Sequence, residues 1–120
     1  MNLKMCYQQL EGDYEDVMSR LPREEMVQRF IFKFLDEKSY DELNNAMQEG
    51  DYETAFRAAH TIKGICQNLS LTKLYKSSNR LTEALRFKKY QEAEELFNAF
   101  SEDYTQNIST IQAYKNALEG

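Results

Sequence analysis

Residues 50–85 read GDYETAFRAAHTIKGICQNLSLTKLYKSSNRLTEAL, and apolar side chains recur through them at the three- and four-residue spacing of amphipathic helices. A first helix is expected from about Asp51 to Asn68, with Gly50 ending the element before it and Asp51 as the N-cap. After Ser70 the same spacing starts again, so a second helix is expected beyond a short turn. The apolar stripes comprise Ala55, Ala58, Ala59, Ile62, Ile65, Cys66 and Leu69 in the first helix, and Leu71, Leu74, Leu81 and Leu85 in the second.

Helical spacing extends from this pair of helices toward both ends of the chain. Upstream, residues 23–49 carry an apolar stripe with a slip near residues 36–40, which indicates either a bend or an interruption. Two short helices, near residues 3–10 and 14–21, precede Pro22. Downstream of Lys89, a last long helix carries Ala93, Phe97, Phe100, Tyr104, Ile108, Ile111 and Leu118 on one side.

Short links between long helices favour antiparallel neighbours. We therefore predict an all-α fold, an antiparallel up-down-up-down four-helix bundle with short additional N-terminal helices. A length of 120 residues fits one domain. We expect residues 1–22 to form the N-terminal helices of that domain and residues 23–120 to form the bundle.

Composition excludes several classes of protein. Only four glycines and one proline are present, too few for the frequent turns of most all-β folds. No apolar run reaches the roughly 20 residues of a membrane span, and the first residues do not resemble a signal peptide. Cys6 and Cys66 lack metal-site spacing and are expected to be reduced cysteines, with no metal site, in a cytoplasmic protein. Nothing resembles a Walker A loop or a dinucleotide fingerprint.

The net charge of −5 conceals an uneven distribution. Residues 57–89 hold eight basic side chains and one acidic one, Glu83, whereas the flanking segments 1–56 and 90–120 are both acidic. A basic segment favours an anionic partner. It also contains His60, the only histidine.

At about 100° per residue, His60 points away from the predicted core. Phe56, Arg57, Lys63, Gly64 and Gln67 fall within about 60° of it. Gly64 lies in the middle of a helix, where glycine costs about 1 kcal/mol relative to alanine, and it clears space beside the imidazole. Lys63 brings an ammonium group to the same face. An exposed imidazole, a cleared flank and a nearby cation suit nucleophilic attack on a phosphoryl group, although a lone exposed histidine is also compatible with an ordinary solvated surface.

The segment Ala58-Ala59-His60-Thr61-Ile62-Lys63-Gly64 resembles the A-H-x-x-K-G core of histidine-containing phosphotransfer (HPt) domains. The likeness continues through the lead-in Gly50-Asp51-Tyr52 and through Asn68-Leu69-Ser70-Leu71, and it covers about residues 50–85. One departure is Ser70, which stands where the family usually has glycine and puts the tightness of that turn in doubt.

The resemblance implies a phosphorelay intermediate in two-component signal transduction that works with response-regulator receiver domains and a hybrid histidine kinase. By similarity, His60 is the phosphoacceptor, Lys63 neutralises the phosphoryl oxygens and Gly64 gives the receiver access. Gln67 is implied to contact the partner, and we expect Phe56 and Arg57 on the same face to do so too. The protein would need no cofactor of its own, since the receiver supplies Mg²⁺, and it would not catalyse independently. We expect a monomer, because one face of the bundle must stay free.

Three other functions stay open at this point. The chain is compatible with a helical adaptor whose histidine is inert, and with the phosphoacceptor domain of a chemotaxis-type kinase. A nucleic-acid binder using residues 57–89 is disfavoured, because no recognised motif is present and both flanks are acidic. We therefore expect neither nucleic acid nor a membrane as a partner.

Overall fold

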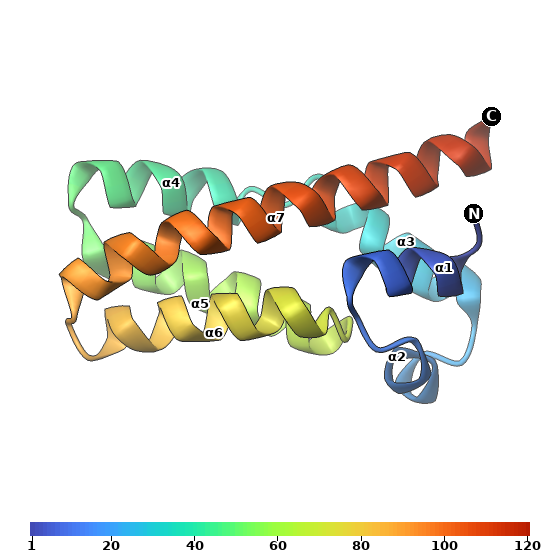
Figure 1. Ribbon diagram of the computed structural model, residues 1–120, viewed down its shortest axis with the longest axis horizontal. Helices are drawn as coiled ribbons and strands as arrows, with labels where there is room; N and C mark the ends of the chain where they lie inside the picture. The colour runs from blue at the N-terminus through green and yellow to red at the C-terminus, as the bar shows by residue number, and fades with distance from the viewer.

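The computed structural model describes residues 1–120 and is entirely helical (Figure 1). The prediction of an all-α fold is confirmed. The seven helices are α1 Leu3–Leu10, α2 Tyr14–Arg20, α3 Glu24–Phe34, α4 Ser39–Glu49, α5 Tyr52–Asn68, α6 Thr72–Arg86 and α7 Tyr90–Glu119.

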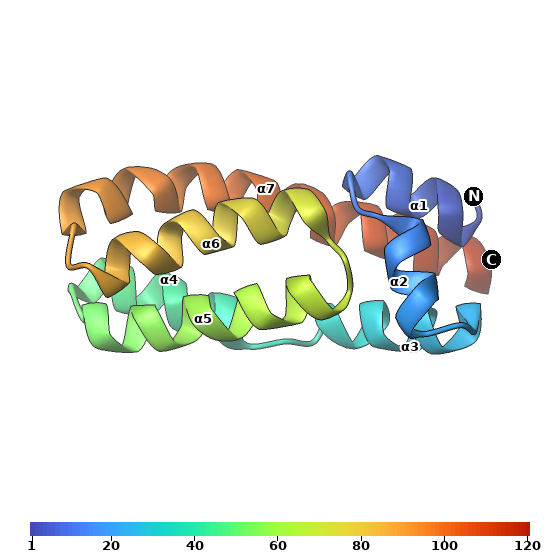
Figure 2. The same cartoon turned by 90° about the horizontal axis from the view of Figure 1, so that it is seen from below.

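Helices α4, α5 and α6 and the first half of α7 form an antiparallel four-helix bundle (Figures 1 and 2). The turns between them are as short as the sequence predicts. Gly50 ends α4 in the left-handed conformation, with φ 73°, which glycine adopts without steric cost. Asp51 is the N-cap of α5, as predicted, because its side chain accepts a hydrogen bond from the backbone N–H of Thr54.

The slip near residues 36–40 is an interruption of the helix. Helices α3 and α4 lie roughly end to end with a short non-helical link between them (Figure 2). The chain leaves α3 through a tight turn in which Glu37 N–H donates to Phe34 O at 3.2 Å. Glu37 then accepts hydrogen bonds from the backbone N–H and the hydroxyl of Ser39, the first residue of α4. These local bonds compete with a continuous helix.

Helices α1 and α3 pack against one side of the second half of α7, beyond the end of the α5–α6 pair, and α2 packs against α1 and α3 (Figure 1). Gln28 of α3 donates a 2.7 Å hydrogen bond to the hydroxyl of Tyr114 on α7. The single long helix α7 therefore packs in both regions of the molecule.

Buried apolar side chains form one continuous core that includes both cysteines as free thiols. Burial raises the pKa of the Cys6 thiol to about 11 and raises the pKa of Cys66 further, so both thiols stay protonated at neutral pH. No helix combines the length and the apolar character that crossing a membrane requires.

Candidate functional site

Helix α5 presents His60 on its solvent side. The opposite side of the helix is anchored by buried Ala55, Ala58, Ile62 and Cys66, which fixes the rotation of the helix in the bundle. His60 is exposed, as the helical spacing predicts. The histidine therefore lies on a rigid, well-packed helix with its ring accessible to another molecule.

An aromatic ring packs against the imidazole on one side. The rings of Phe56 and His60 are nearly parallel, 13° apart, with centroids separated by 5.9 Å. The guanidinium carbon of Arg86, from α6, lies 5.0 Å from the centroid of the Phe56 ring. Phe56 is thus held between α5 and α6, and it limits the directions from which a partner can reach His60.

Lys63 makes an ion pair across to α6. Its side chain is only 18% exposed, and its Nζ lies 3.8 Å from Oε1 of Glu83. The other oxygen of Glu83 accepts a 3.1 Å hydrogen bond from Nε of Arg86. Spacing along α5 could not reveal these two neighbours, because they belong to another helix. In the sequence, one feature sets Glu83 apart as a candidate partner for a nearby cation: it is the only acidic residue among residues 57–89.

Gly64 leaves open space beside His60. A Cβ atom built on Gly64 meets no heavy atom within 4 Å. The gap predicted from the sequence is therefore present, and packing inside this chain does not require the glycine. Glycine lowers the stability of the helix relative to alanine, and no contact inside the chain offsets that loss.

Arg57 and Gln67 lie on the His60 side of α5, and their recorded contacts are with residues other than His60. Arg57 is 67% exposed and pairs with Glu53 at 3.5 Å, a contact between two mobile surface side chains. Gln67 is exposed in the last turn of the helix, where its backbone carbonyl accepts a 3.1 Å hydrogen bond from Arg20.

The turn after α5 is held by side chains of the N-terminal helices. Ser70 adopts the left-handed conformation, with φ 55°, at the position where HPt domains usually have glycine. Its hydroxyl donates to Asp16 and accepts from Arg20, both at 2.6 Å. The hydrogen bonds from Ser70 and Arg20 lower the pKa of Asp16. The turn is therefore tight, and the serine side chain links it to α2.

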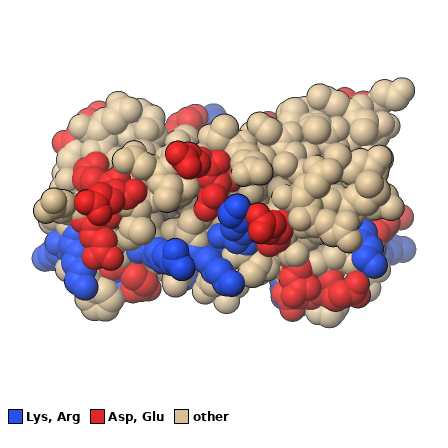
Figure 3. Space-filling model, in the orientation of Figure 1, with Lys and Arg blue, Asp and Glu red and all other residues tan.

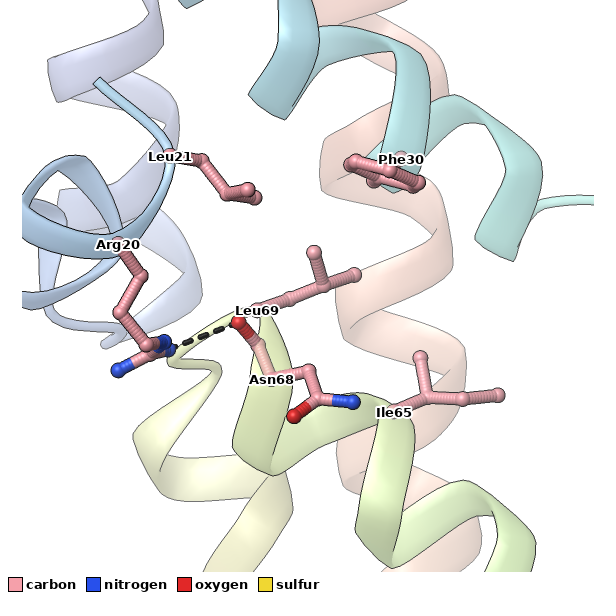
Figure 4. A pocket seen from close by; sticks show the side chains of 6 residues that line it. All are labelled: Arg20, Leu21, Phe30, Ile65, Asn68 and Leu69. Carbon is pink, nitrogen blue, oxygen red and sulfur yellow. Dashed lines mark hydrogen bonds between the residues drawn. The ribbon is translucent and has the colours of Figure 1, made fainter. Parts of the chain in front are cut away.

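An apolar hollow of about 370 Å³ lies beside the C-terminal end of α5 (Figure 4). Its floor and walls come from three helices and the link after α2, and Phe30 stands at its edge with 38% of its surface exposed. Helical spacing cannot reveal this hollow, because it exists only where segments far apart in the sequence meet. The hollow is lined by Arg20, Leu21, Phe30, Ile65, Asn68 and Leu69.

The eight cations of residues 57–89 do not gather around His60. Two belong to α5, four to α6 and two to the link before α7, so they are spread over two helices and a turn. Figure 3 shows basic side chains along α6, with acidic ones above them over α7. Lys73, for example, faces away from α5 and pairs with Glu11 at 2.9 Å and with Asp103 at 3.9 Å.

No group of three or more His, Cys, Asp or Glu side chains is close enough to hold a metal ion.

The comparisons with known proteins add one result. The family model described as Hpt domain matches residues 25–117. Neither a curated protein nor a solved structure matches the chain.

Proposed function

Because the chain belongs to the Hpt domain family, we propose that His60 accepts a phosphoryl group from one receiver domain and passes it to another. The family itself implies histidine phosphotransfer in two-component signalling. The observation that carries the assignment to His60 is its exposed ring beside the empty space at Gly64, on a helix anchored in the bundle core.

The transfer is a nucleophilic substitution at phosphorus. The unprotonated ring nitrogen of His60 attacks the phosphorus of the aspartyl phosphate. An N–P bond forms as the O–P bond breaks, and the electron pair of that bond stays on the carboxylate of the first receiver. In the second transfer, an aspartate oxygen of the next receiver attacks phosphorus, and the electron pair of the N–P bond returns to the imidazole.

The remaining roles follow from position. Lys63, three residues along the helix from His60, is proposed to neutralise the phosphoryl oxygens, and Gly64 to admit the active site of the receiver. Phe56, Arg57 and Gln67 are proposed partner contacts, because all three lie on the His60 side of α5. The apolar hollow lies further along α5, on a different side of the helix from His60, and its exposed Phe30 is apolar area that a partner can cover.

We assign the Mg²⁺ and the carboxylate cluster to the receiver, so the protein acts as a phosphotransfer intermediate and not as an independent catalyst. A monomer in the cytoplasm fits this role, since the His60 face must be free for receivers and kinase.

The decisive experiment incubates the protein with a panel of receiver domains phosphorylated on aspartate. We expect acid-labile phosphate on the wild-type chain and none on His60→Gln. Urea unfolding of the variant should be unchanged within about 0.5 kcal/mol, because an exposed side chain is replaced. Phosphate that persists on the His60→Gln variant would refute the assignment, and absence of transfer from every receiver would favour a helical adaptor with an inert histidine.

A further inference from the structure

Glu83 has no role in the transfer as described so far, yet it contacts the lysine on which that transfer depends. Its carboxylate faces Lys63 with one oxygen, at 3.8 Å, and Arg86 with the other, at 3.1 Å. Arg86 in turn lies over Phe56, which stacks on His60. Glu83 and Arg86 therefore connect Lys63 to Phe56 through a continuous set of contacts. Lys63 and Phe56 each lie about one helical turn from His60.

The two contacts of Glu83 differ in strength. The Lys63 pair is longer than a hydrogen bond and joins partly exposed side chains, so breaking it costs little free energy. The Arg86 contact is a charge-assisted hydrogen bond, and it leaves Glu83 with a partner after Lys63 has moved. A phosphoryl group on His60 would carry up to two negative charges within reach of Lys63 and would compete for its ammonium group.

We propose that Glu83 is a positioning residue that holds Lys63 while His60 is unphosphorylated and gives it up to the phosphoryl oxygens when His60 carries the group. This inference rests on the proposed function of His60. It identifies Glu83 as the side chain that disfavours the phosphorylated state of that histidine. Glu83 stabilises the unphosphorylated state, since its pair with Lys63 exists only there, and its charge repels the bound phosphoryl group. It thereby favours handing the group on over retaining it.

The test requires no receiver. Phosphoramidate phosphorylates histidine chemically, and the ³¹P chemical shift of the product, followed against pH, gives the midpoint at which the phosphoryl group loses its last proton. Glu83→Gln keeps the size of the side chain and removes its charge. We expect the midpoint to fall by roughly 0.3–0.7 pH unit, a two- to fivefold change in proton affinity, because Lys63 is then free to stabilise the dianion.

Two variants separate this role from a general loss of charge. Glu53→Gln removes an acid from the same side of α5 that pairs with Arg57 instead of Lys63, and its shift should be less than a third as large. In a Lys63→Ala background, Glu83→Gln should move the midpoint by less than half as much as in the wild type, as expected for a residue that acts through Lys63.

An unchanged midpoint in Glu83→Gln overturns the inference. Equal shifts with and without Lys63, or a shift equal to that of Glu53→Gln, also overturn it. Failure of receivers to phosphorylate His60 refutes the proposed function separately, because the titration with phosphoramidate involves no receiver.

Discussion

The turn after α5 and the His60 face of the same helix are held by different kinds of contact. Around the turn after α5, the N-terminal helices make short hydrogen bonds: the Tyr7 hydroxyl donates to Leu69 O at 2.7 Å, and the Asp13 N–H donates to Ser70 O at 2.8 Å. On the His60 face of α5, the ion pairs of Lys63 and Arg57 measure 3.8 and 3.5 Å. Short hydrogen bonds are therefore concentrated at the C-terminal end of the reactive helix, whereas the reactive face has contacts that are easy to exchange.

The largest effect on stability is expected from Tyr7→Phe. This change removes the only hydrogen-bond donor to the carbonyl of Leu69, in a place where both residues are buried. The orphaned carbonyl should cost about 1–3 kcal/mol in the free energy of unfolding, measured with urea. Transfer to His60 should change less than twofold at a temperature where the variant is folded. A stability within 0.3 kcal/mol of the wild type would show that this bond does not hold the turn.

Gly64→Ala should stabilise the folded protein and at the same time slow phosphoryl transfer to His60. Alanine meets no neighbour there and restores helix propensity, so the free energy of unfolding should rise by about 1 kcal/mol. The added methyl group occupies the space that the proposal reserves for the receiver. Transfer from a phosphorylated receiver should therefore fall about tenfold, equivalent to about 1.4 kcal/mol.

Chemical phosphorylation by the small donor phosphoramidate serves as the control for that variant, and it should be unchanged within about twofold. A more stable protein that still accepts phosphate from receivers at the wild-type rate would contradict the role given to Gly64.

The smallest effect is expected from Ser70→Gly, which restores the residue usual in HPt domains. Glycine relieves the left-handed backbone, a gain of about 1 kcal/mol, but loses the hydrogen bonds to Asp16 and Arg20. Because Asp16 and Arg20 are partly exposed and stay paired with each other, the net loss should also be about 1 kcal/mol, so that the two effects nearly cancel. A net change above 1 kcal/mol in either direction would show that one contribution dominates.

The same variant should also alter the acid side of the stability profile. The pKa of Asp16 is lowered in the folded protein, mainly by the Ser70 hydroxyl. A lowered pKa contributes stability above the unfolded value, about 3.9, and this contribution is lost as pH falls through the folded value. In Ser70→Gly, the pKa of Asp16 measured by NMR should move back toward 3.9, and the loss of stability below that pH should be less steep. An unchanged Asp16 titration would contradict this effect of the Ser70 hydroxyl.

Features encoded along one helix could be predicted, whereas features built between helices could not. The direction of His60 and the gap at Gly64 follow from 100° per residue around α5. Glu83 and Arg86 reach the site from α6, and helical spacing does not give the relative rotation and height of two packed helices. Helical spacing does not distinguish a bend from a break after α3, because the break depends on the side-chain hydrogen bonds of Glu37 to Ser39.

Helix α7 has 30 residues, which corresponds to about 45 Å at 1.5 Å per residue, and it passes through both packing regions. Its first half lines the bundle that presents His60, and its second half packs against α1 and α3. Buried side chains from both halves, Phe100 and Tyr104 in the first and Ile111 and Tyr114 in the second, belong to one continuous core. Thermal or chemical unfolding should therefore proceed as one cooperative transition, with the amides at the centre of α7 among the slowest to exchange with solvent.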